Sequence, residues 1–354
     1  MIGIERDVMD LMPSAEQEEI AATVAAFLAD RMPVVGRGRD HVVAAPEIAD
    51  DLWRDCTDLG WLSLGLSESA GGVGFTLVEE MMLFRELGRG VAPGPFLPGV
   101  LGAHLAAAAG DPDLTESIAS GATKVALGTP IGPAELRSSV SCEVSVVHVD
   151  GAEYILVCDD RSASLVPTER CELEAIDPVE GSITTGRGRL DGVSSTVYVD
   201  AATEPIFLRG LVLAAAAATG VAEAVLDVAV AYAGTRVQFG KPIGTFQAIK
   251  HRCADMKVSA DGAYAQASYA AVAVRDGLDG AALEAAIAKY VADEAARVNS
   301  EGAVQIHGAM GFTSEAVPYR YVARAHLLGR CLASRAELLD RIIGRNASSE
   351  AEPS

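Results

Sequence analysis

Residues 235–247, TRVQFGKPIGTFQ, gather residue types that could hold a flat, anionic ligand. One arginine (Arg236), one amide (Gln238) and one aromatic ring (Phe239) occur there beside two glycines. An arginine and free backbone N–H groups at a helix start bind phosphate, and a nearby ring can cover a planar group. Taken alone, an ordinary turn between two helices with an exposed arginine explains this segment better than a binding site does.

A second segment of this kind, residues 305–312 (QIHGAMGF), closes a predicted helix. Gly308 and Gly311 are typical of a helix C-cap followed by a loop. They would also let a ligand approach the backbone closely, because glycine has no Cβ. By itself this signal is weak as well.

Together and in this order, the two segments resemble the C-terminal domain of acyl-CoA dehydrogenases. R-x-x-F-G-x-P-I-x-x-F-Q is followed some 60 residues later by Q-x-x-G-x-x-G-F. The resemblance continues in Gly60-Trp61, Glu68, the glycines 71, 72 and 74, and Glu86-Leu87-Gly88-Arg89. In this family the two motifs contact the ADP half of an FAD bound largely by a neighbouring subunit. The resemblance therefore implies these cofactor-binding residues: Arg236, Gln238, Phe239, Phe246, Gln247, Gln305, His307, Gly308 and Ala309. Ala309 is a departure, since the family usually has a second glycine there.

The resemblance also implies the reaction. Acyl-CoA dehydrogenases remove an α proton and a β hydride from an acyl-CoA thioester. A carboxylate takes the proton, because the α C–H is a poor acid and needs a positioned base, and FAD takes the hydride. An electron-transfer flavoprotein is the implied redox partner.

The carboxylate base has no counterpart at either of the positions where the family places it. Where many family members have Tyr-Glu-Gly-Thr, the sequence reads Cys331-Leu332-Ala333-Ser334. Other members place a Glu beside the arginine of the first motif, where this chain has Thr235 and Val237. Glu315 matches a Glu that the family often has outside the catalytic position, and Glu337 is more simply a solvated helix residue. The catalytic residue is therefore unknown.

The predicted β segment departs from the family as well. Gly128-Thr129-Pro130 weakly resembles the family's Thr-Glu-Pro stretch but lacks its acidic residue. No Trp follows Trp61, although the family has one beside the flavin ring. Parts expected to touch the ring and the acyl group are missing, whereas parts expected to reach a neighbour's FAD are kept. This pattern predicts the non-catalytic, FAD-clasping subunit of a heteromeric bacterial acyl-CoA dehydrogenase, of the α2β2 kind that includes enzymes acting on sterol-derived acyl-CoAs.

Other functions stay open. The chain could be a self-sufficient homo-oligomeric dehydrogenase with an unconventional base, a related flavin oxidase or monooxygenase, or a non-enzymatic scaffold. A metal site is not expected, because His251, Cys253 and Asp255 are more simply ordinary helix residues and no paired Glu-x-x-His motifs occur.

The elements that must position these residues follow a helix–strand–helix order. We expect a mainly α fold with a small β domain: an N-terminal helical domain (1–122), a middle β domain (123–205), a C-terminal four-helix bundle (206–345) and a disordered tail (346–354). Ser14 and Gln17 predict a capping box at the first helix. The bundle helices are expected at 206–234, 242–276, 281–306 and 319–343, with Pro242 in the first turn of the second.

Bulk composition excludes several classes of partner. The formal net charge of -21 argues against nucleic acid and against anionic membranes, which both need clustered Lys and Arg. The apolar run 206–232 is long enough to span a bilayer, but Arg209, Glu223 and Asp227 interrupt it, which favours a buried bundle helix. The six cysteines show no pairing or metal spacing, and the N-terminus has no signal-peptide pattern, so we expect a cytoplasmic protein with reduced thiols.

Overall fold

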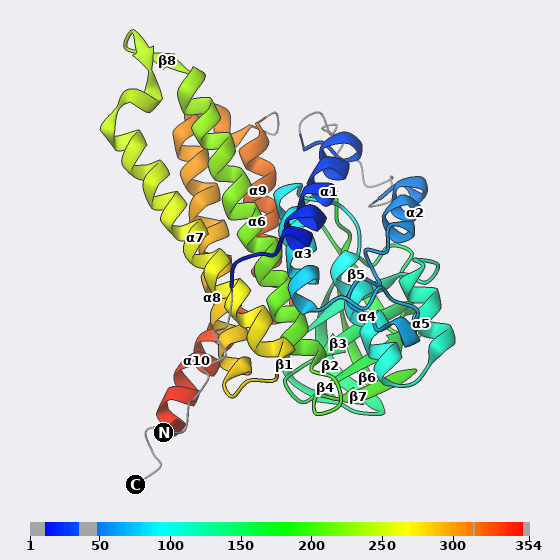
Figure 1. Ribbon diagram of the computed structural model, residues 1–354. Helices are drawn as coiled ribbons and strands as arrows, with labels where there is room; N and C mark the ends of the chain where they lie inside the picture. The colour runs from blue at the N-terminus through cyan, green and yellow to red at the C-terminus, as the bar shows by residue number, and fades with distance from the viewer. Residues whose placement is uncertain (1–10, 35–47, 314–315, 350–354) are drawn as a thin grey trace, which may run out of the picture.

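The computed structural model describes residues 11–34, 48–313 and 316–349 (Figure 1). Its N-terminal part is helical, and its helices are α1 (Ala15–Arg31), α2 (Asp50–Asp58), α3 (Leu77–Arg89), α4 (Phe96–Ala108) and α5 (Pro112–Ala119). The predicted capping box begins α1: the Ser14 hydroxyl accepts from the backbone N–H of Gln17, and the Gln17 side chain accepts from that of Ser14.

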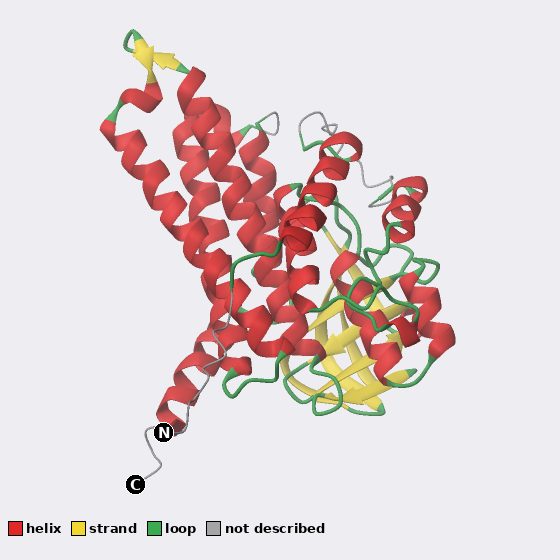
Figure 2. Cartoon of the chain, in the orientation of Figure 1, coloured by secondary structure: helices red, strands yellow, loops and turns green. Residues whose placement is uncertain are grey.

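The strands that follow form one sheet of seven, visible in Figure 2 beside the helices. They are β1 (Val125–Leu136), β2 (Ser139–Val147), β3 (Tyr154–Cys158), β4 (Ser162–Pro167), β5 (Glu172–Ile176), β6 (Thr185–Ser194) and β7 (Val197–Asp200). Their spatial order is β5-β6-β2-β1-β3-β4-β7, and only the β1–β3 pair is parallel among them. One face, with Leu127, Leu156 and Leu165, joins the core formed by the helices, and the other face forms an apolar cluster of its own.

The C-terminal part is helical again. Its helices are α6 (Ile206–Thr235), α7 (Gln247–Arg275), α8 (Ala281–His307), α9 (Val317–Leu328) and α10 (Arg335–Ser349). Short 3-10 turns lie at Glu68–Ala70, Thr168–Arg170, Ile243–Thr245 and Gly308–Phe312. A mainly α fold with a small sheet between two helical parts is therefore confirmed.

Three details of the predicted bundle were wrong. The fourth helix is two helices, because Gly329 ends α9, Leu332 takes a left-handed conformation (φ 72°) and the Ser334 hydroxyl caps α10. Pro242 belongs to a short strand instead of a first helical turn, and α7 begins only at Gln247. Helix α10 runs to Ser349, into the predicted tail, because no Gly or Pro interrupts 345–349.

Helix α6 is the centre of the bundle. It is long and apolar enough to cross a membrane by length and composition, but 83% of its apolar window is buried inside the protein, as in a core helix. Asn299 on α8, itself fully buried, donates from its amide to the carbonyls of Ala222 on α6 (3.1 Å) and Met256 on α7 (2.9 Å). These bonds fix the positions of α6, α7 and α8 relative to one another along the bundle axis.

Helices α3 and α6 cross with their backbones almost in contact. A Cβ placed on Gly220 would overlap the carbonyl oxygen of Arg85, and one placed on Gly88 would overlap that of Ala217. Both atoms belong to helical backbone, which cannot swing aside as a side chain can. The glycines are therefore required for the N-terminal helices to pack on the bundle.

We expect Gly220→Ala to lower the free energy of unfolding by about 1–3 kcal/mol, the usual effect of overpacking a tight interior. Urea denaturation of the purified chain measures this. Gly262→Ala is the matched control, because Gly262 lies exposed on α7 with nothing within 4 Å of its virtual Cβ. Replacing an exposed helical glycine by alanine stabilises by about 0.5–1 kcal/mol, so the two variants should shift the midpoint in opposite directions.

Candidate functional site

The first predicted segment forms a β-hairpin at the end of the helical bundle, labelled β8 in Figure 1. Strands β8 (Val237–Gln238) and β9 (Lys241–Pro242) pair in antiparallel fashion, and Phe239-Gly240 form the two-residue turn. Both turn residues have positive φ, 53° and 80°, as a type I′ turn requires. Glycine adopts this conformation freely, whereas a bulky residue such as Phe239 does so at a cost.

The hairpin displays an aromatic ring to solvent. Phe239 is 91% exposed, and its ring meets that of Phe246 edge to face, with the centroids 6.1 Å apart. The ammonium of Lys241 lies 4.5 Å from the Phe246 ring centroid. One face of Phe239 is thus free to stack on a planar group, with a cation close by.

The second predicted segment lies at the same end of the bundle. Helix α8 ends at His307, and Gly308, with a positive φ of 65°, is its C-cap, as predicted. The His307 ring stacks on Tyr232 of α6, with centroids 4.0 Å apart and planes at 20°, and its Nδ1 pairs with the Ala303 carbonyl at 2.8 Å. Because Tyr232 lies one turn before Arg236, this stack joins the ends of α6 and α8 and brings the two motifs to one place.

Most of the predicted cofactor-binding side chains face solvent. The exposed members are Arg236, Gln238, Phe239, Gln247, Gln305, Gly308 and Ala309, while Phe246 and His307 are half-buried. The Gln238 amide donates to the Val237 carbonyl (2.8 Å). Among the described side chains, Arg236 has no acidic partner, in a chain with 49 acidic and 28 basic residues. An exposed ring beside an unpaired guanidinium fits the base and phosphates of the ADP half of FAD.

The residue at the position expected for the base, Leu332, is buried. Leu332 is 5% exposed, and a Cβ on Gly210 would lie 2.9 Å from one of its methyl carbons. Its backbone N–H donates to the Thr129 hydroxyl at 3.0 Å. The two segments predicted to depart from the family pattern, 128–130 and 331–334, are therefore bonded directly to each other.

Two of the groups in or near that segment, Cys331 and Glu337, are protonated or already bound to the backbone. Burial raises the pKa of the Cys331 thiol to about 11, so it stays protonated at neutral pH. The Glu337 carboxylate accepts from the Ser334 backbone N–H (2.7 Å), while the Ser334 hydroxyl accepts from that of Glu337 (3.3 Å), which is a capping box for α10. Glu315 lies outside the described residues.

Cys331 lines a small cavity between the sheet and both helical parts. The cavity measures about 50 Å³, and its walls include Leu127, His148, Ala214, Arg324 and Leu328. The Arg324 guanidinium, which is buried, donates to Glu180 (2.5 and 2.9 Å) and to the Ala92 carbonyl (2.9 Å). Burial opposes ionisation of Glu180, but the charge and hydrogen bonds of Arg324 lower its pKa, so the pair is ionic. Sites for small ligands usually measure about 300–1,000 Å³, so this cavity is too small for an acyl thioester.

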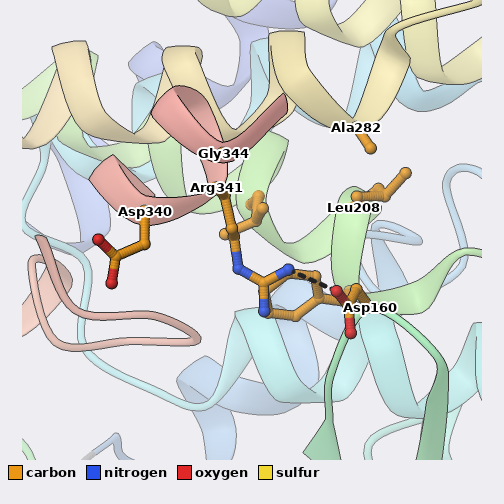
Figure 3. Close-up of a pocket in the computed structure, with 8 residues that line it drawn as sticks. Asp160, Leu208, Ala282, Asp340, Arg341 and Gly344 are labelled. Carbon is orange, nitrogen blue, oxygen red and sulfur yellow. Dashed lines mark hydrogen bonds and ion pairs between the residues drawn. The ribbon is translucent and has the colours of Figure 1, made fainter. Parts of the chain in front are cut away.

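A larger cavity, about 300 Å³, lies beside α10 and is drawn in Figure 3. Arg341 of α10 pairs there with Asp160 at 2.8 Å, and its guanidinium lies 4.9 Å from the ring centroid of Phe207. None of the residues predicted to bind a cofactor lines this cavity. In Figure 1, α10 and the hairpin lie at opposite ends of the bundle.

Sequence reasoning did not single out Lys241, Tyr232 or the contact between Thr129 and Leu332. Lys241 could have been found from its place inside the first motif, between Gly240 and Pro242. The stack of Tyr232 on His307 and the bond between Thr129 and Leu332 join residues far apart in the chain, so no local pattern predicts them. No group of three or more His, Cys, Asp or Glu side chains that could hold a metal ion occurs in the described ranges.

Two family comparisons cover most of the chain. The acyl-CoA dehydrogenase N-terminal domain matches residues 14–122, and the acyl-CoA dehydrogenase C-terminal domain matches residues 201–347. Acyl-CoA dehydrogenase IpdE2 of Mycobacterium tuberculosis is 31% identical over 94% of this chain and 98% of its own length. Acyl-CoA dehydrogenase FadE34 of the same organism is 33% identical over 86% of this chain, which spans only 44% of that relative's length.

Solved structures share the fold. The ChsE4-ChsE5 complex from Mycobacterium tuberculosis has a chain that superposes with a TM-score of 0.82 at 24% identity, covering 98% of this chain and 100% of that one. A chain of the Tcur3481-Tcur3483 steroid ACAD G363A variant gives a TM-score of 0.83 at 24% identity, covering 95% and 99%. The motifs, the domain matches and the full-length likeness to IpdE2 lead to one conclusion: this chain belongs to the acyl-CoA dehydrogenase family of FAD-dependent oxidoreductases.

Proposed function

We propose that this chain is the non-catalytic, FAD-clasping subunit of a heteromeric acyl-CoA dehydrogenase. One observation carries the proposal: the place expected to hold the base is closed by a buried Leu332 bonded to Thr129, while the hairpin turns Phe239 fully outward. A ring exposed to this extent is available to a cofactor held elsewhere. The closed place offers neither a carboxylate nor room for an acyl group.

Relatives support an assembly of unlike chains. The two structural neighbours named above are described as ChsE4-ChsE5 and Tcur3481-Tcur3483, each a pair of different chains. More than half of FadE34 lies outside the part that this chain matches, which leaves room there for a second unit of similar size. We infer an α2β2 enzyme whose other subunit binds the acyl-CoA, with an electron-transfer flavoprotein as acceptor and a sterol-derived acyl chain as the preferred class of substrate.

In this assembly the residues of this chain would bind FAD and orient it. FAD supplies the hydride chemistry when bound. Arg236 would neutralise phosphate charge, and the Phe239 ring would cover the adenine. Gly308 and Ala309, exposed at the end of α8, would let the ligand approach the backbone, since neither has a side chain beyond Cβ. Proton abstraction would belong to a carboxylate of the partner.

Flavin content tests the proposal directly. Flavin absorbance per chain would be measured for the protein purified alone and after co-expression with a second acyl-CoA dehydrogenase chain. We expect little flavin alone and about one FAD per pair of chains in the complex. A homo-oligomer of this chain with full flavin and turnover would overturn the proposal.

Arg236→Ala should lower FAD retention in the complex about tenfold, because a charge-assisted bond to phosphate is lost. The rate of FAD release on dilution, followed by flavin fluorescence, measures the change. Arg54→Ala is the control: Arg54 lies exposed on α2 without an acidic partner among the described side chains, and its loss should change nothing. Equal release rates for Arg236→Ala and the unaltered complex would argue against the site.

A further inference from the structure

We propose that Lys241 is a second phosphate-binding residue of the hairpin, held in place for that purpose by the ring of Phe246. This inference rests on the proposed function and adds to the site a residue that its motif leaves unspecified. The position between Gly240 and Pro242 is a free position in the R-x-x-F-G-x-P pattern.

The first argument is the geometry of the hairpin. Lys241 pairs with Gln238 across the ribbon, so it directly follows the turn that displays Phe239. Its ammonium lies 4.5 Å from the Phe246 centroid, and the Phe239 centroid lies 6.1 Å from the same point. The Phe239 ring and the ammonium thus both border Phe246, so one ligand can stack its base on Phe239 and extend its phosphates towards Lys241.

The second argument is charge. Lys241 is exposed and has no carboxylate partner among the described side chains, although acidic residues outnumber basic ones by 49 to 28. Arg236, immediately before the hairpin, also has no carboxylate partner among the described side chains. Elsewhere on the bundle surface, Lys257 and Arg297 are paired with acids one turn away, whereas Lys250 is unpaired among the described residues but has no exposed Phe, Tyr or Trp in its own segment of α7. Two unpaired cations flanking one exposed ring are the complement of a nucleoside diphosphate, whose diphosphate carries two or more negative charges.

The third argument is that the Lys241 side chain is already held in place before a ligand binds. A free lysine side chain has many rotamers, and ordering it on ligand binding costs conformational entropy. The contact with Phe246 is a cation–π interaction that already favours one placement of the ammonium. The ring therefore reduces the conformational entropy that Lys241 loses when it binds phosphate. A surface lysine without such a contact would lose more.

The test uses the complex co-expressed with its partner and measures FAD release against salt concentration. Lys241→Met keeps the aliphatic stem on Phe246 but removes the charge. We expect it to release FAD about tenfold faster than the unaltered complex, with a weaker dependence on salt because one phosphate contact is gone. Lys241→Arg should retain FAD almost normally. Lys250→Gln is the matched control, because Lys250 is equally exposed and unpaired among the described residues but lies on α7, past the hairpin.

The outcomes separate this inference from the function on which it rests. Normal retention in Lys241→Met together with loss in Arg236→Ala would overturn the role of Lys241 and leave the proposed function standing. Normal retention in both would overturn both. If Lys241→Met instead dissociates the two chains on gel filtration, Lys241 binds an acidic group of the partner protein, and the phosphate assignment is wrong.

Discussion

Replacing Glu80 by alanine is expected to lower the free energy of unfolding by roughly 3–5 kcal/mol, the usual effect of breaking a buried ion pair. Glu80 on α3 is 1% exposed. Its carboxylate pairs with His104 on α4 (2.8 Å) and with Arg209 on α6, and Arg209 also reaches Glu204 (3.2 Å). The substitution would leave the largely buried Arg209 charge without its main partner, and it would loosen the N-terminal helices from the bundle.

Urea denaturation at pH 7 measures this loss. Glu116→Ala, on the exposed side of α5, is the control and should stay within about 0.5 kcal/mol of the unaltered chain. The double variant Glu80→Ala/Arg209→Met should recover part of the stability, because it removes the orphaned charge together with the pair. A Glu80→Ala chain as stable as the control would show that Arg209 finds another partner.

The stability that Glu80 contributes should depend on pH. Burial alone would oppose ionisation of Glu80, but the charges and hydrogen bonds of Arg209 and His104 outweigh it and lower the pKa to about 2. A carboxyl group whose pKa is lower in the folded chain stabilises above its unfolded pKa, and this stabilisation is lost as the pH falls towards the folded pKa. The difference between the unaltered chain and Glu80→Ala should therefore be constant above about pH 4.5 and shrink between pH 4.5 and pH 2.

Phe239→Asn is expected to have opposite effects on the hairpin and on the cofactor. Asn-Gly is the preferred pair for a type I′ turn, whereas a phenylalanine with φ 53° is strained there. Asparagine should stabilise the closed hairpin by about 1 kcal/mol, so that amides of 232–247 exchange roughly fivefold more slowly. The loss of base stacking should accelerate FAD release from the complex roughly 10- to 100-fold.

Hydrogen exchange followed by mass spectrometry, together with the release assay, tests both effects on one variant. Phe239→Trp serves as the control, because it keeps a stacking surface and should retain FAD. Unchanged retention in Phe239→Asn would mean that the exposed ring does not contact the cofactor. Faster exchange in that variant would mean that Phe239 supports the hairpin itself, and the strain would then need another explanation.

Several features of this chain could be predicted because their signals are local. The Ser14–Gln17 capping box and the glycine cap at Gly308 involve hydrogen bonds within a few residues, so a short window of sequence contains all the partners. The helix–strand–helix order follows from the period of apolar residues, which is also local. The two motifs identify the family through residue types and spacing alone.

Other features depended on packing between distant segments. The prediction of a helix from 242 was wrong, because it used Pro242 as a helix start and could not see that residues 237–242 pair with each other across a strained turn. The break at 329–334 was also missed, since the left-handed Leu332 is held by Thr129, which lies 203 residues earlier in the chain.

By itself, then, the sequence determined the family and the order of the elements, and it predicted that the expected catalytic positions lack a carboxylate. Only the tertiary structure decided that the place expected for the base is closed, that Phe239 faces solvent and that Lys241 rests on Phe246. Residue type and spacing report local hydrogen bonding and periodicity. Whether a cavity stays open or a ring stays exposed depends instead on how separately encoded surfaces pack, and no short window of the sequence contains both of those surfaces.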